Sequence, residues 1–130
     1  MDEWRRVWRS PRPALIFKHS TRCPISARAN DAFVRWAGGA DADAPLPCRV
    51  LVVEDRAVSD AVAADTGVAH QSPQALLVQG GRVLWHASHW AIDETALAAA
   101  AADPATAPGR STTLAQALRE RRGSTAASAT

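Results

Sequence analysis

The sequence predicts one α/β domain in which a four-stranded mixed sheet is flanked by helices. Short apolar runs alternate with segments whose apolar residues recur at helical spacing. Two adjacent glycines, Gly80 and Gly81, separate the last two apolar runs, as in a tight hairpin. The length of 130 residues and the hydrophobic fraction of 47% suit one domain with room for flexible ends. The predicted element order of the domain is therefore β-α-β-α-β-β-α.

The first elements follow from apolar spacing and from prolines. Trp4 and Trp8 stand one helical turn apart in residues 2–9, which predicts a short helix before the prolines that follow. Residues 14–18 form an apolar run typical of a buried strand. Residues 24–36 predict a helix, whose apolar face consists of Ile25, Ala29, Ala32, Phe33 and Trp36.

The second strand is predicted at residues 49–54, around a run of consecutive apolar side chains. The helix that joins it to the first strand is long enough for the two strands to run parallel. Residues 59–66 predict another helix, with Ser59 as its N-terminal cap and Gly67 at its end. The first half of the domain is therefore a βαβ unit followed by a helix.

The remaining strands are predicted at residues 74–79 and 82–87, on either side of the glycine pair. Both runs are apolar at adjacent positions, so we expect both faces of the sheet to be covered. Asp93 is placed to cap a last helix that extends through Ala102. The fourth strand is antiparallel to the third across the hairpin, and we expect it to run in the same direction as the first.

Cys23 lies between a predicted strand and a predicted helix, immediately before Pro24. Proline suits the first helical position, because the N–H that it lacks would be unpaired there anyway. A thiol just before it faces free backbone N–H groups and the positive end of the helix dipole, which favours the reactive thiolate. Ser26 occupies the position where a dithiol redox motif carries its second cysteine. The site therefore has one thiol, which can attack a disulfide but cannot close the usual short internal disulfide.

The segment around Cys23 and three later segments resemble the YtxJ family, the monothiol bacilliredoxins of the thioredoxin-like superfamily. The four segments that carry the resemblance are residues 18–26, 54–56, 72–77 and 85–92. They occur in the same order as in the family, and the resemblance covers residues 13–102. It implies the minimal thioredoxin-like topology and an enzyme that removes bacillithiol from proteins on which it has formed a mixed disulfide.

The same resemblance implies the partners of the reaction. These are client proteins that carry bacillithiol, bacillithiol itself as a co-substrate, and a reductase that regenerates the enzyme. The exchange chemistry needs no bound organic cofactor or metal. The extent of the resemblance and the low-complexity composition after Asp103 divide the chain into an N-terminal segment at 1–12, a thioredoxin-like domain at 13–103, and a low-complexity extension at 104–130. In the extension we expect a weak helix over 112–122 and a disordered tail.

The candidate catalytic residues are Cys23, Ser26 and Arg22. Cys23 is the expected nucleophile; the alternative, a cysteine that packs as a small hydrophobe, suits a turn poorly. Ser26 either donates a hydrogen bond to the thiolate or is an exposed polar residue of the first helical turn. Among the basic residues Lys18, Arg22 and Arg28, Arg22 is the best candidate to hold the thiolate or the carboxylates of a small thiol.

The candidate residues for binding the small thiol are Ser72, Pro73, Ser88 and His89. The resemblance implies a cis Ser72–Pro73 bond that faces the active cysteine, whereas the alternative is an ordinary trans proline of a loop. Ser88 and His89 follow the fourth strand, which should end on the Cys23 side of the sheet.

The residues around Ser88 and His89 have other interpretations. Structural packing of Trp85 or Trp90 with a hydrogen-bonded histidine is one alternative. His86 and His89 could also suggest a metal site, but two histidines without further ligands are a weak signal. We expect this segment to form the rim of the small-thiol site.

Cys48 is the only other cysteine, and we do not expect it to be a resolving thiol. Cys23 follows the end of the first strand, whereas Cys48 precedes the start of the parallel second strand. The two thiols should then lie at opposite ends of the sheet, roughly 15–20 Å apart at about 3.3 Å per residue. A disulfide needs Cα atoms within about 7 Å.

Charge and hydropathy exclude some classes of protein. A net charge of +2 provides no general basic field, which argues against a nucleic-acid partner. No segment is long enough to span a membrane, and residues 1–9 have no apolar signal region. We therefore expect a cytoplasmic protein with no membrane partner, in which both cysteines are free thiols.

Two other functions remain open from the sequence. The first is a carrier of iron–sulfur clusters, as some monothiol glutaredoxin-like proteins are, although Pro24 replaces the glycine of their CGFS sites. The second is a non-enzymatic stress or adaptor protein that uses the same site for binding.

Overall fold

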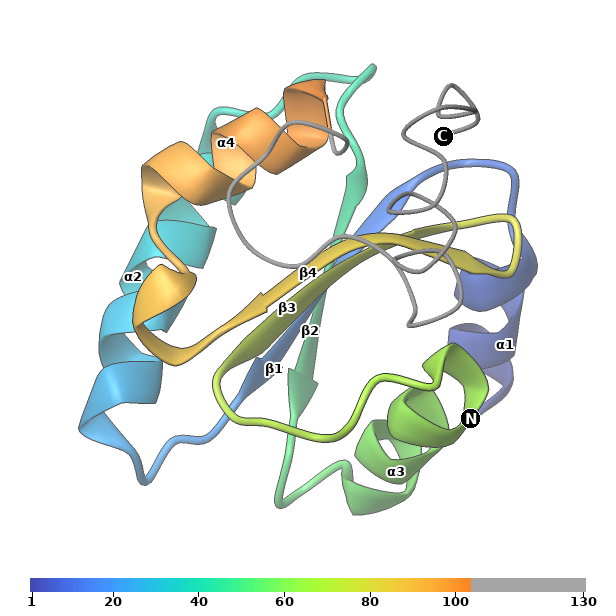
Figure 1. The fold of residues 1–130 in the computed structure, drawn as a ribbon, viewed down its shortest axis with the longest axis horizontal. Coiled ribbons are helices and arrows are strands. Elements are labelled where there is room, and N and C mark those ends of the chain that lie inside the picture. The colour runs from blue at the N-terminus through green and yellow to red at the C-terminus, as the bar shows by residue number, and fades with distance from the viewer. Residues whose placement is uncertain (104–130) are drawn as a thin grey trace, which may run out of the picture.

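The computed structural model describes residues 1–103, in which a four-stranded sheet forms the centre of the molecule (Figure 1). The strands are β1 (Ala14–His19), β2 (Leu46–Leu51), β3 (Gln74–Gln79) and β4 (Arg82–Ser88). Their order in the sheet is β2-β1-β3-β4. β1 pairs in parallel with β2 and antiparallel with β3, which pairs antiparallel with β4. The predicted mixed α/β sheet is confirmed, and the helix and tail predicted at 112–130 lie outside the described residues.

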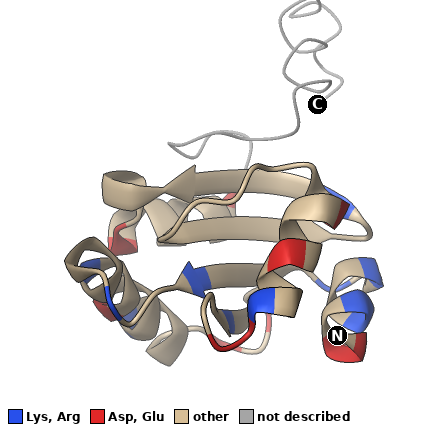
Figure 2. Cartoon of the chain, turned by 90° about the horizontal axis from the view of Figure 1, so that it is seen from below, with Lys and Arg blue, Asp and Glu red and all other residues tan. Residues whose placement is uncertain are grey.

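Helices cover both faces of this sheet. The helices are α1 (Asp2–Arg9), α2 (Pro24–Gly38), α3 (Arg56–Thr66) and α4 (Glu94–Ala102), with a short 3-10 helix η1 (His89–Ala91) before α4. Figure 1 shows α2 and α4 on one side of the sheet and α1 and α3 on the other. In Figure 2 the strands are mostly uncharged, and the charged residues stand mainly on the helices and connections. The sheet therefore has two apolar cores, one on each face.

The core between the sheet, α2 and α4 is built around aromatic rings. Phe17 of β1 stacks on Phe33 of α2, with 5.0 Å between ring centroids. Trp85 of β4 has no exposed surface, and Leu97 of α4 packs in the same cluster. The predicted apolar face of α2 is buried at Ala29, Ala32, Phe33 and Trp36.

The core on the opposite face includes the N-terminal helix. Trp4 of α1 is buried, stacks on Trp8 at 5.6 Å, and donates its indole N–H to Asp65 of α3 at 2.8 Å. The tight turn between β3 and β4 is attached to the end of α1. Its residues Gly80 and Gly81 both have positive φ, and their N–H groups donate to the carbonyls at positions 10 and 8. The first helix is thus part of the folded unit.

The second strand begins earlier than predicted. It was expected at 49–54, but β2 covers Leu46–Leu51, and Val53 lies beyond it with 47% of its surface exposed. Pro47 makes the start of this segment look like a loop. Because β2 is an edge strand, a residue without an N–H donor is tolerated there.

The start of α3 also differs from the prediction. The helix begins at Arg56, and its N-terminal flanking residue is Asp55, whose carboxylate accepts the Leu51 N–H at 3.1 Å. Ser59, predicted as the cap, lies inside the helix and is buried. The predicted end is confirmed, since Gly67 follows the helix in the left-handed conformation.

The Trp4–Asp65 hydrogen bond should stabilise the attachment of α1. Replacing Trp4 with Phe keeps an aromatic ring but removes the donor, which should lower the free energy of unfolding by about 1–2 kcal/mol. Chemical denaturation measures it, with Trp8→Phe as the control because Trp8 shares the stacking contact. In a double-mutant cycle with Asp65→Ala, which removes the acceptor, strictly additive losses would contradict the interaction.

Candidate functional site

Cys23 lies at the N-terminal end of α2, in extended conformation with φ −118° and ψ 123°. Pro24 is the first helical residue, and the Ala27 N–H donates to the Cys23 carbonyl at 3.0 Å. The side chain is half-buried and the thiol is free. The predicted arrangement of strand, turn, cysteine and proline-started helix is confirmed. Both the dipole of α2 and its unpaired N–H groups favour a negative charge at this position.

Ser26 has a different environment from the exposed one that the sequence offered as one alternative. It has no exposed surface, so it is not an exposed polar residue of the helix. Its hydroxyl accepts the Ser20 N–H at 2.9 Å and forms a 2.8 Å hydrogen bond with His19 Nδ1. Both hydrogen bonds join the start of α2 to the end of β1 and the residue that follows it. Ser26 therefore fixes the turn that presents Cys23.

His19 is a site residue that sequence reasoning missed. Its side chain is buried and stacks on Phe17, with 5.7 Å between ring centroids. Burial lowers the pKa of His19, and the positive charge of Arg49 adds to this effect against the opposite effect of Glu54. A neutral imidazole therefore faces Ser26 at neutral pH. The sequence could have indicated His19, because a polar side chain ends a strand that is otherwise expected to be apolar and buried.

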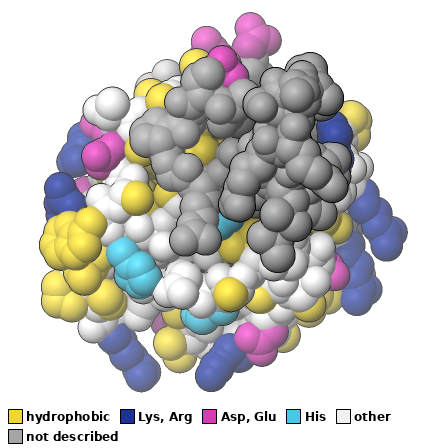
Figure 3. Space-filling view, in the orientation of Figure 1, with side chains coloured by type: hydrophobic (Ala, Val, Ile, Leu, Met, Phe, Trp, Pro, Cys, Tyr) yellow, Lys and Arg dark blue, Asp and Glu magenta, His cyan; other side chains and the backbone are white. Residues whose placement is uncertain are grey.

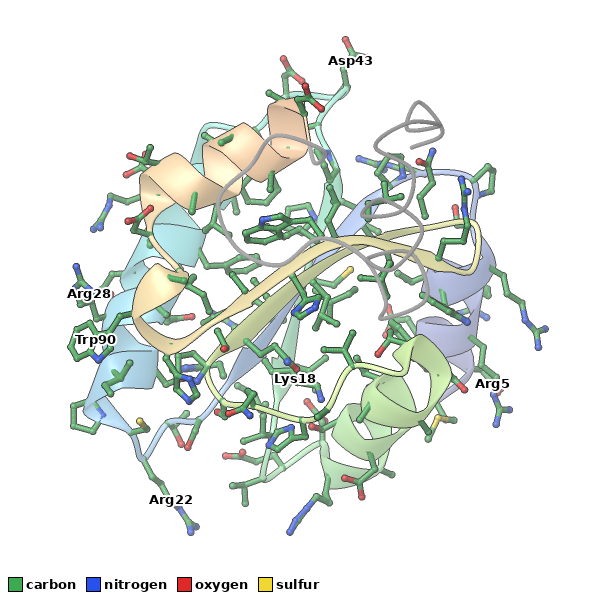
Figure 4. All side chains as sticks on the ribbon, in the orientation of Figure 1. Arg5, Lys18, Arg22, Arg28, Asp43 and Trp90 are labelled. Atoms are coloured by element: carbon green, nitrogen blue, oxygen red, sulfur yellow. The ribbon has the colours of Figure 1, made fainter. Side chains whose placement is uncertain are left out.

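Arg22 precedes Cys23 and is exposed. Figure 4 shows its side chain extended away from the body of the protein. Its backbone N–H donates to the Ser20 hydroxyl at 3.3 Å, which helps to shape the turn. The guanidinium is therefore available to an incoming molecule.

The cis bond expected between Ser72 and Pro73 is present. Pro73 immediately precedes β3, and the pairing of Lys18 with Gln74 places it beside the end of β1. The Pro73 carbonyl accepts the His89 N–H at 3.0 Å, so the segment after β4 is bonded to the cis-proline turn. The hydroxyl oxygen of Ser72 is buried and has no hydrogen-bond partner among the described residues.

Ser88 and His89 lie at the same end of the sheet as the C-terminal end of β1. Ser88 is the last residue of β4 and pairs with Gln74, and His89 begins η1 with a φ of 53°. The chain leaves β1 at this end and continues to Cys23. The cysteine, the cis-proline turn and the Ser88–His89 segment therefore lie at one end of the sheet. Trp90 is not packed in the core, because 62% of its surface is exposed.

Lys18 does not face the α2 side of the sheet, where it was considered as a partner of the thiolate. It belongs to the face covered by α3, and its Nζ forms a 3.1 Å hydrogen bond with His70 Nδ1. Lys18 has no exposed surface, and burial lowers its pKa to about 8 against the opposite effect of Asp60. The pKa of His70 is lowered, first by burial and then by Lys18. Lys18 thus ties β1 to the loop that leads to Pro73.

Cys48 is not at the position predicted for it. It lies within β2, opposite Ile16, rather than before the strand. It packs against the core under α1 and α3 and lines a cavity of about 370 Å³ between α1, β2 and α3. Burial raises the pKa of the Cys48 thiol, and the Glu3 carboxylate adds to this effect against Arg12. The two free thiols are therefore separated by the sheet as well as along it.

Residues 1–103 also bear on other kinds of site. No cluster of three or more histidine, cysteine or acidic residues could hold a metal ion in this part of the chain. No helix in the same residues has the length and hydrophobicity required to cross a bilayer.

Comparison with known proteins identifies the class of the fold and site. A solved structure described as a candidate oxidoreductase with a thioredoxin fold is 33% identical and superposes with a TM-score of 0.69, covering 77% of this chain and 87% of the other. Thioredoxin from Malassezia sympodialis is 16% identical, with a TM-score of 0.60 and coverage of 81% and 85%. The chain therefore has the thioredoxin fold.

The family follows from a family model described as monothiol bacilliredoxin BrxC, which matches residues 1–97. The chain belongs to the monothiol bacilliredoxin family, as its sequence motifs predicted. The family and the fold together support a redox function based on thiol chemistry.

Ser26→Ala should destabilise the protein because it leaves two partners, the Ser20 N–H and His19 Nδ1, without their hydrogen bonds. The expected loss in the free energy of unfolding is about 1–3 kcal/mol. Urea denaturation measures it, with Thr21→Ala as a control in the exposed part of the same turn. Equal stability of the two variants would contradict this role of Ser26.

Lys18 should make stability depend on pH. The unfolded chain binds the lysine proton up to a pKa near 10.5, whereas the folded protein releases it near pH 8. Stability relative to Lys18→Met should therefore rise as the pH increases from 8 towards 10.5, by about 1–2 kcal/mol between pH 7.5 and 9.5. Denaturation midpoints at the two pH values test this, with Arg5→Met as the control. The prediction fails if wild type and Lys18→Met change in parallel.

Proposed function

We propose that this protein is a thiol–disulfide oxidoreductase of monothiol type that removes bacillithiol from mixed disulfides on client proteins. The observation that carries the proposal is the environment of Cys23. It is a half-exposed thiol at the start of a proline-initiated helix, at the end of the sheet where the cis-proline turn also lies. The membership of the bacilliredoxin family supplies the identity of the small thiol.

In the first step, the Cys23 thiolate attacks the bacillithiol sulfur of the mixed disulfide. A bond forms between these two sulfurs, and the bond between bacillithiol and the client breaks. The client leaves as a thiolate and takes up a proton from water. Cys23 now carries bacillithiol as a mixed disulfide, and no net oxidation has occurred.

In the second step, an external thiolate attacks the mixed disulfide on Cys23. If bacillithiol attacks, the products are bacillithiol disulfide and the Cys23 thiolate; a partner reductase is the other source of the thiol. The structure supports an external source, because Ser26 takes the position of a second cysteine and Cys48 lies on the other face of the sheet. The helix start stabilises the Cys23 thiolate both as nucleophile and as leaving group.

The backbone around Pro73 supports the binding of an extended client segment. The cis-proline turn precedes β3 at the edge that Cys23 approaches, and the Ser72 hydroxyl there is unpaired among the described residues. A client segment that binds there would make short strand-like contacts with the turn. Such contacts hold the client disulfide in line with the Cys23 sulfur.

Cys23→Ser should abolish the release of bacillithiol from a modified client, whereas Cys48→Ser should retain most of it. The reason is that Cys23 is accessible at the helix start, while burial raises the pKa of Cys48 and disfavours its thiolate. Client release measured by intact mass tests the claim, and iodoacetamide at pH 7 should modify Cys23 faster than Cys48. Comparable loss in a folded Cys48→Ser variant would contradict the one-thiol mechanism.

A further inference from the structure

Trp90 is the most exposed of the large hydrophobic side chains in the described residues, with 62% of its surface accessible. The other tryptophans of the chain are buried or half-buried, as is usual for this residue. Trp90 also lies outside both core clusters. Figure 3 shows hydrophobic side chains at the edge of the molecule where Figure 4 places Trp90. The fold therefore gives this indole no packing role.

Arg28 of α2 accompanies the exposed indole. Its guanidinium carbon lies 5.0 Å from the centroid of the Trp90 ring, a cation–π contact (Figure 4). Most of the Trp90 surface remains exposed beside this contact. Arg28 makes no ion pair with any residue in the described part of the chain. Arg28 is exposed, so its N–H donors remain available to a ligand.

The pair stands close to the reactive thiol. Arg28 is five residues beyond Cys23, which corresponds to about 7.5 Å along the axis of α2. Trp90 belongs to η1, whose first residue donates its N–H to the Pro73 carbonyl at 3.0 Å. Both residues are thus held by elements that form the thiol site.

We propose that Arg28 and Trp90 bind the sugar and malate groups of bacillithiol when its sulfur is joined to Cys23. This inference rests on the proposed function and assigns the recognition of its small thiol. Bacillithiol consists of a cysteinyl group on glucosamine, which is linked to malate. The C–H face of the pyranose fits the exposed surface of the indole, and the malate carboxylates fit the fork of donors on Arg28.

The arrangement explains how one site discriminates between small thiols. Cysteine brings the same reacting sulfur to Cys23 but has neither the sugar nor the malate. The contacts with Arg28 and Trp90 therefore stabilise the bacillithiol adduct and leave the cysteine adduct unaffected. A bidentate pair with a carboxylate also fixes the orientation of the bound thiol, which a point charge does less well.

The test is the equilibrium between Cys23 and small disulfides, measured by intact mass in a Cys48→Ser background. The protein is equilibrated with bacillithiol and its disulfide at fixed ratios, and separately with cysteine and cystine. Trp90→Ala and Arg28→Gln should each lower the formation constant of the bacillithiol adduct about 5- to 20-fold, as expected for the loss of one stacking or charged contact. The constant for the cysteine adduct should not change.

Val34→Ala is the matched control, because Val34 is an exposed apolar residue of α2 outside this pair. Equal losses with both small thiols, or no loss with either, would overturn the inference while leaving the proposed function standing. If the parent protein forms the cysteine adduct but no bacillithiol adduct, both the proposed function and the inference are wrong. Trp90→Phe, which keeps an aromatic face, should recover part of the lost affinity.

Discussion

The burial of β1 on both faces is the constraint on which the rest of the structure depends. β1 lies between β2 and β3, and all of its residues are buried. Its last two residues are nevertheless polar, and they point to opposite faces of the sheet. A buried polar group must find a hydrogen-bond partner, so each residue binds a segment that passes the end of the strand. His19 binds Ser26 at the start of α2, and Lys18 binds His70 before the cis-proline turn.

These two contacts link the site to the core. Through His19 and Ser26, the turn that presents Cys23 is fixed to the central strand. Through Lys18 and His70, the loop before Pro73 is fixed to the same strand from the other face. The turn that carries Cys23 and the loop before the cis-proline are therefore positioned by adjacent residues of one strand. Both segments are therefore held by a strand that is paired on both sides and buried along its whole length.

Much of the fold could be predicted because local patterns determine it. The apolar runs, the glycine pair and the proline after Cys23 each specify one conformation, and the structure agrees with them. The errors arise where tertiary context decides. Pro47 reads as a loop residue, yet it is tolerated in β2 because that strand lies at the edge of the sheet. Ser59 reads as a cap, but the helix extends one turn further toward the N-terminus.

The same distinction applies to the site. The positions of Cys23 and the cis-proline turn follow from the order and direction of the strands, which bring both to the same end of the sheet. The direction of a side chain at the end of a strand does not follow in this way. Lys18 is one residue from His19, and the alternation of a strand sends their side chains to different faces. The Arg28–Trp90 contact joins two segments that are far apart in the sequence, so no local pattern predicts it.

The proline in β2 has a consequence for encounters between molecules. An edge strand exposes a row of backbone donors and acceptors that other extended chains can join. Pro47, near the start of β2, supplies no N–H to that row, and Pro45 precedes the strand. Continuous sheet extension along this margin is thereby interrupted. The proline therefore protects this margin of the sheet against edge-to-edge pairing with other extended chains.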